Sequence, residues 1–136
     1  MPDIASLCQR ARRIVEAPGE VIHEIVSSED GLGYGEAVIL LQESKPHVHF
    51  QTAEAYFMLE GSADVFITDD CGATRTTTLL PGKSLSIPIG SWHYAKSNSP
   101  SPACLIAITM PAWSSVDHIT REDVEKGAKE TREGIG

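Results

Sequence analysis

The chain carries three histidines and one glutamate whose spacing could hold a metal ion. His47 and His49 are separated by one residue, so on a β-strand their imidazoles point to the same face. Glu54 follows five residues later, which is the wrong parity for one continuous strand, so the chain must bend before it. His93 comes after a turn at residues 88–90. Three imidazoles and a carboxylate are nitrogen and oxygen donors that suit iron, manganese, nickel, zinc or copper.

Short strands separated by turn residues surround these side chains and predict an all-β sandwich or barrel. The spacing of apolar residues predicts a helix over residues 3–15, which ends at Pro18 and Gly19. A second, charged helix is predicted over residues 121–130, preceded by a capping box from Thr120 to Asp123. Strands are expected at residues 20–27, 33–43, 54–60, 63–68, 75–80, 84–87, 93–97 and 103–109.

The four residues fall within two motifs that resemble those of the cupins. The motifs read His47-x-His49-x4-Glu54-x6-Gly61 and Gly82-x5-Pro88-x-Gly90-x2-His93. The resemblance implies a single cupin barrel, a jelly-roll-like double-stranded β-helix. It also implies that His47, His49, Glu54 and His93 bind a divalent metal inside this barrel. Two support positions depart from the family pattern: Leu41 replaces a glycine, and Asn98 comes one residue late.

The length of 136 residues predicts one domain for residues 1–136. The barrel core is expected at about residues 20–110, between the helix at 3–15 and a C-terminal appendage at 111–136. Small cupins commonly pair, so we expect a homodimer in which the N-terminal helix and the apolar outer strands form the interface.

Charge and composition narrow the partners. Nineteen acidic residues against eleven basic residues give a net charge of -8, which disfavours nucleic acid. The longest apolar runs are far shorter than the roughly 20 residues that a membrane span needs. The three cysteines are widely spaced and odd in number, which is typical of reduced thiols. These features predict a cytoplasmic protein that acts on a small molecule.

Four protein ligands leave one or two positions open on a five- or six-coordinate metal, as in catalytic sites. We predict a metal-dependent enzyme that oxidises a small organic molecule with dioxygen, as many cupins do. The alternatives are a non-redox sugar or keto-acid isomerase, epimerase or lyase, and a cupin that only binds a ligand. Glu54 and Tyr56 are the predicted catalytic residues, because parity places both on one strand face. His23 and His118 have no partners at ligand spacing and are assigned no role.

Overall fold

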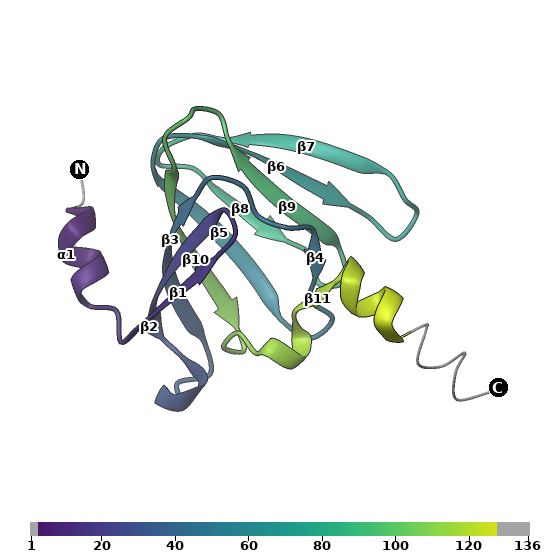
Figure 1. Cartoon of the computed structure of the whole chain (residues 1–136), viewed down its shortest axis with the longest axis horizontal. Helices are drawn as coiled ribbons and strands as arrows, with labels where there is room; N and C mark the ends of the chain where they lie inside the picture. The colour runs from purple at the N-terminus through teal and green to yellow at the C-terminus, as the bar shows by residue number, and fades with distance from the viewer. Residues whose placement is uncertain (1–2, 128–136) are drawn as a thin grey trace.

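The computed structural model describes residues 3–127, and its strands form two antiparallel sheets. The six-stranded sheet contains β1 (Arg13–Ala17), β2 (Glu20–Val26), β3 (Gly35–Leu41), β10 (Ala103–Met110), β5 (Ala53–Glu60) and β8 (Ser84–Ile87), in that order. The five-stranded sheet contains β11 (Ile119–Thr120), β4 (His47–Val48), β9 (Trp92–Ser97), β6 (Ala63–Thr68) and β7 (Thr74–Leu79), in that order (Figure 1).

Apolar side chains from both sheets meet between them. Alternate residues of β6 are buried, because successive side chains of a strand point to opposite faces. Val65 of β6 packs in one cluster with Met58 of β5 and Leu105 of β10, and all three are almost completely buried. This core confirms the predicted all-β barrel built of two antiparallel sheets with a short helix at each end.

The N-terminal helix is shorter than the predicted range of residues 3–15. Helix α1 runs only from Ile4 to Gln9, and residues Arg13–Ala17 form β1, which pairs with β2. The prediction was wrong there because a short apolar run fits helical and strand periodicity alike, and the partner β2 decides for the strand. Leu7 and Cys8 of α1 pack against an outer cluster on the six-stranded sheet that includes Leu59.

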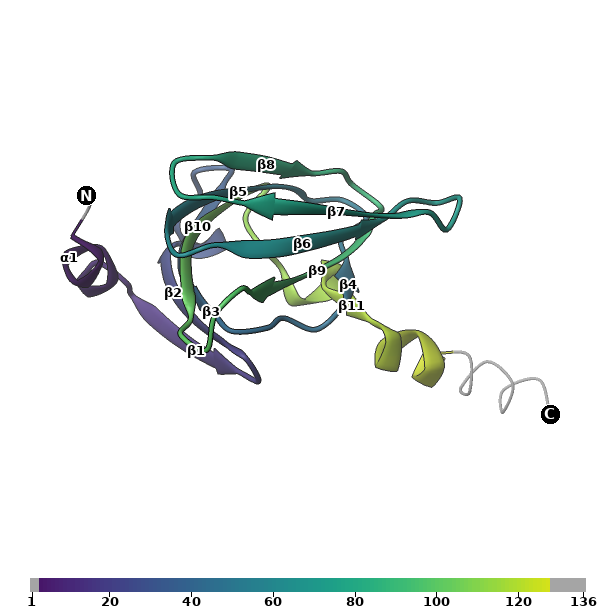
Figure 2. The ribbon, with the colours of Figure 1, turned by 90° about the horizontal axis from the view of Figure 1, so that it is seen from above.

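After β10 the C-terminal segment passes from the six-stranded sheet to the five-stranded sheet and then continues into a helical stretch. It contains the 3-10 turn η2 (Ser115–Asp117) and β11, which pairs with β4. Residues 121–127 are helical, and the rest of the predicted helix lies outside the described residues. Thr120 and Asp123 form the predicted cap, with the Thr120 amide donating to the Asp123 carboxylate at 2.8 Å. Figures 1 and 2 show this helical segment and α1 at opposite ends of the molecule.

All three motif glycines, Gly61, Gly82 and Gly90, occupy backbone conformations that side chains disfavour. Gly61, between β5 and β6, has a φ of 77°, and a Cβ there would lie 3.3 Å from the Ala103 Cα. Gly90 has a φ of 83° and donates its N–H to the His49 carbonyl at 2.8 Å. The turn that precedes His93 is therefore tied directly to the segment that carries His49. Within the described residues no helix is long and apolar enough to cross a membrane.

Candidate metal centre

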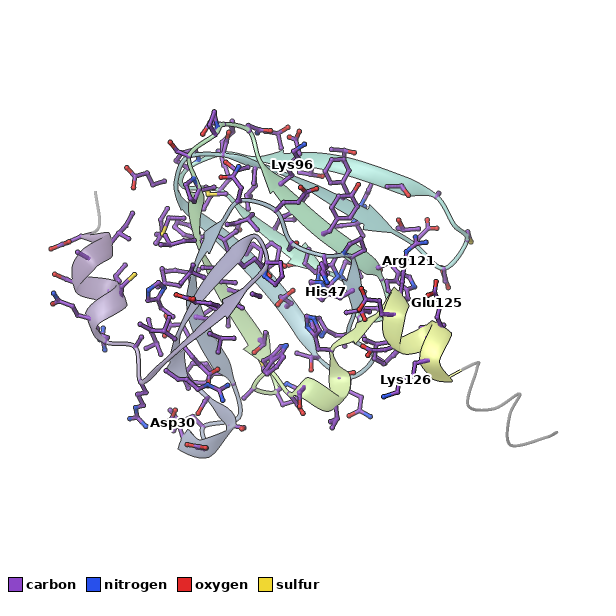
Figure 3. The ribbon with its side chains drawn as sticks, viewed as in Figure 1. Asp30, His47, Lys96, Arg121, Glu125 and Lys126 are labelled. Atoms are coloured by element: carbon purple, nitrogen blue, oxygen red, sulfur yellow. The ribbon has the colours of Figure 1, made fainter. Side chains whose placement is uncertain are left out.

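The four predicted ligands come from both sheets and converge between them. His47 on β4 is the register partner of His93 on β9. Glu54 stands near the start of β5 in the other sheet, after the predicted bend, and His49 lies on the segment that follows β4. Their candidate donor atoms all lie within 4.8 Å of one another. Figure 3 shows the His47 side chain in the interior, near the strands that carry its neighbours.

The protein backbone fixes the orientation of each imidazole ring. A carbonyl oxygen can only accept, so each bonded Nδ1 carries the proton and a neutral ring keeps its lone pair on Nε2. Carbonyl partners of this kind are typical of metal-binding histidines. The Nδ1 atoms of His47, His49 and His93 donate to the carbonyls of Lys45 (2.8 Å), Asp117 (2.7 Å) and Ser91 (3.0 Å) respectively.

In the neutral rings the Nε2 atoms carry no proton, and they face the carboxylate of Glu54. His93 Nε2 lies 3.0 Å from Glu54 Oε1, and His49 Nε2 lies 3.9 Å from the same oxygen. His49 Nε2 is buried and has no hydrogen-bond partner among the residues that the structure describes. Lone pairs that converge in a buried space repel one another unless a cation lies between them. The donor set therefore fits a divalent metal ion.

Burial and mutual charge keep the site in the protonation state that a metal needs. Burial, with a smaller contribution from the neighbouring His93, lowers the pKa of His47 to about 3. Burial by itself raises the pKa of Glu54. The contact of Glu54 with His93 Nε2 and the positive charge that protonated histidines carry in the metal-free site outweigh this effect, so the Glu54 pKa is lowered overall. Glu54 is therefore ionised and His47 neutral near pH 7.

A cavity of about 480 Å³ extends from His47, His49 and Glu54 along the inner face of the six-stranded sheet. Apolar groups make up most of its wall, and charged and polar side chains line the remainder. Tyr56 lines it beside Glu54, as the strand parity predicts. Burial, the Glu54 and Glu20 carboxylates and a hydrogen bond to Glu54 raise the pKa of Tyr56 well above its usual value. Tyr56 therefore keeps its proton at neutral pH.

Sequence reasoning missed three residues beside the cluster. Glu20 of β2 lines the cavity, and burial with the nearby Glu54 raises its pKa to about 7. His118 was assigned no role, yet its ring stacks on that of His47 with centroids 4.3 Å apart. The Asp117 carboxylate accepts from the Phe50 amide at 2.8 Å, which fixes the loop after His49. Spacing carries no signal for these contacts, because the segments meet only in the folded chain.

The family follows from a match to more than half of the sequence. A family model described as a cupin domain matches residues 39–109 of the 136. This chain belongs to the cupin family. The matched range includes both motifs and all four candidate ligands of this cupin.

Similar proteins share only part of this cupin. Germin-like protein 1-3 of Oryza sativa subsp. japonica is 36% identical over 62 residues, which are 46% of this chain and 28% of the relative. The rhicadhesin receptor of Pisum sativum is 34% identical over 62 residues, 46% of this chain and 29% of the receptor. This cupin thus covers less than a third of the length of these relatives.

Solved structures with the same fold include oxalate decarboxylases. That of Lactobacillus farciminis, in a formate complex, has a TM-score of 0.68 at 19% identity, over 75% of this chain and 32% of that one. A Bacillus subtilis oxalate decarboxylase studied for its Mn(II) centres has a TM-score of 0.68 at 17% identity, over 76% and 29%. At these identities the likeness concerns the fold alone.

Proposed function

We propose that this cupin binds one divalent transition metal through His47, His49, Glu54 and His93 and oxidises a small organic molecule with dioxygen. The observation that carries the proposal is the convergence of three backbone-oriented Nε2 atoms and one ionised carboxylate beside a cavity of about 480 Å³. The Mn(II) centres of a structural neighbour make manganese one candidate for the metal, beside iron, nickel, zinc and copper.

A divalent metal in this site would supply open coordination positions where a substrate oxygen or dioxygen can bind. The chain's own residues set the surroundings of that position. Glu54 contributes negative charge and accepts a hydrogen bond from Tyr56. Tyr56 retains its proton, so it can donate a hydrogen bond but is a poor base near neutral pH.

The test is elemental analysis of the full chain, purified without chelator or histidine tag, beside two variants. His49→Ala removes a candidate ligand whose Nε2 has no hydrogen-bond partner in residues 3–127, and it should abolish metal retention. His23→Ala is the matched control, because His23 is on β2 and outside the ligand cluster, and should keep the metal. Retained metal with dioxygen uptake on a candidate substrate supports the proposal. Absence of metal after reconstitution, or equal retention in both variants, contradicts it.

A second candidate is proton transfer on a sugar or keto acid, favoured by the buried Tyr56 hydroxyl beside the cluster. This reaction needs no dioxygen, so turnover that survives anaerobic conditions would replace the first proposal. Glu54→Gln separates both from a cupin that only binds: an enzyme should lose orders of magnitude in rate, while a binding module should keep its ligand affinity.

The single domain at residues 1–136, the homodimer and the cytoplasmic location stay predictions. The homodimer has a direct test in light scattering at micromolar concentration. A monomer under these conditions would refute the pairing through α1 and the outer strands.

A further inference from the structure

We infer that the cavity selects a chelating ligand with an apolar body and at most one negative charge, and that it rejects small dianions. The inference rests on the proposed metal site and names the class of molecule that this site accepts. Two independent features of the cavity carry it: the balance of charges along its lining and the composition of its wall.

The charges that line the cavity are mostly negative. Glu20, Glu24 and Glu36 line it in addition to Glu54. Among the described lining residues, Arg13 is the single Lys or Arg, and its guanidinium lies 2.9 Å from the Glu24 carboxylate. No lysine or arginine of the described lining is therefore left to bind a second carboxylate of the ligand.

The charge at the metal itself balances one anion and no more. A metal ion binds imidazole in its neutral form and carboxylate in its ionised form, so a divalent ion held by three histidines and one glutamate would keep one net positive charge. A monoanionic chelator neutralises this charge. A dianion leaves an excess negative charge in a buried space that also contains Glu20, where Coulomb repulsion is weakly screened. The pKa of Glu20, raised to about 7 by burial and by Glu54, shows that this region already disfavours negative charge.

The wall beyond the metal ligands suits an apolar body. The cavity volume of about 480 Å³ lies within the range of ligand pockets and far exceeds the needs of a two-carbon acid. Burial of one methylene in such a wall improves affinity by about fourfold. The apolar side chains come from β1, β2, β3 and β10, and they are Val15, Ala17, Ile22, Ala37, Ile39 and Ala107.

The preference for ligands with at most one negative charge is tested by calorimetry at pH 8. Zinc-loaded full-length protein is titrated with two probes of nearly equal shape. Oxalate is a dianion, and oxamate carries an amide in place of one carboxylate. We expect oxamate to bind about tenfold more tightly than oxalate, the equivalent of one charge repulsion of about 1.4 kcal/mol. Glu20→Gln should improve oxalate affinity severalfold and leave oxamate affinity nearly unchanged. Tighter binding of oxalate by the wild-type protein overturns the inference.

The apolar wall is tested with acetohydroxamate, butyrohydroxamate and hexanohydroxamate, which share one chelating group. Affinity should rise about fourfold per methylene. Ala37→Phe fills the cavity and should remove this rise without affecting acetohydroxamate. Leu40→Phe is the matched control, because Leu40 packs with the outer cluster on the same strand and should leave the series unchanged.

The outcomes separate the inference from the proposed function. Failure of the wild-type protein to retain zinc overturns the proposed metal site and the inference with it. Zinc retention with affinities that do not depend on chain length, or that Ala37→Phe and Leu40→Phe alter equally, overturns the inference alone. Zinc retention with the expected order of probes supports both.

Discussion

The stability of a Glu20 variant measures how unfavourable a negative charge is in the cavity of the metal-free protein. Its carboxyl is partly buried on β2, and burial together with the Glu54 carboxylate raises its pKa from 4.5 to about 7, with His93 opposing. In the unfolded chain this pKa returns to its ordinary value. Between pH 4.5 and 7 the folded state therefore binds more protons than the unfolded state, and its stability falls as the pH rises through this window.

The size of the effect follows from the pKa difference. A rise from 4.5 to about 7 corresponds to about 3 kcal/mol at 1.36 kcal/mol per pKa unit. Partial exposure of the carboxyl screens its charge, so we expect about 2 kcal/mol. Glu20→Gln removes the charge and should stabilise the metal-free protein by this amount at pH 8, or about 6 °C in Tm. At pH 4.5 the wild-type carboxyl is already protonated in the folded state, so the gain should largely disappear.

The assay is urea unfolding, at both pH values, of wild-type and variant protein from which a chelator has removed the metal. Glu16→Gln is the control, because Glu16 is exposed on the neighbouring strand β1 and should change the stability by less than about 0.5 kcal/mol. Equal stabilisation by Glu20→Gln at both pH values would show that packing, not charge burial, is responsible. Destabilisation at pH 8 would show that the carboxylate is favourable where it lies, and would refute the reasoning.

Three further substitutions test the supports of the site and the fold. Asp117→Ala removes the acceptor of the Phe50 and Gln51 amides and should weaken metal binding about 10- to 100-fold in a chelator competition; unchanged affinity would refute the role of this carboxylate. Gly90→Ala places a side chain at a φ of 83° and should cost about 1–2 kcal/mol in thermal unfolding, whereas an unchanged Tm would contradict the strain. Leu7→Ala should cost about 1–2 kcal/mol in urea unfolding, because Leu7 is only partly buried, and no loss would show that α1 contributes nothing to stability.

The barrel could be predicted from the sequence because its strands are bounded by turn residues and its inner positions alternate. The predicted ranges 63–68 and 84–87 agree with β6 and β8 in both bounds. The two-residue strands β4 and β11 could not be predicted, since pairs this short have no periodicity. They form because β4 pairs with β9 and β11 pairs with β4, contacts that arise only in the folded chain.

The candidate ligands could be predicted because their spacing is local within each motif and the bend before Glu54 follows from parity. Their supports could not. The carbonyl that orients His49 belongs to Asp117, and the carboxyl that faces the cavity from β2 belongs to Glu20. Neither residue stands at a fixed distance from a motif, and contacts across the sheets depend on the closure of the barrel.

His118 shows how hydrogen bonding separates a ligand from a neighbour of ligands. Its ring stacks on His47, yet the Trp113 indole N–H donates to its Nδ1 at 3.2 Å. An indole can only donate, and burial lowers the pKa of His118, so the neutral ring carries its proton on Nε2, the opposite of the three ligand histidines. Nε2 is then a hydrogen-bond donor that cannot bind a metal. We therefore expect His118→Ala to keep the full metal content that His49→Ala loses, measured by elemental analysis of both proteins. Equal loss of metal would mean that the Trp113 contact breaks when the metal binds and that His118 is a ligand.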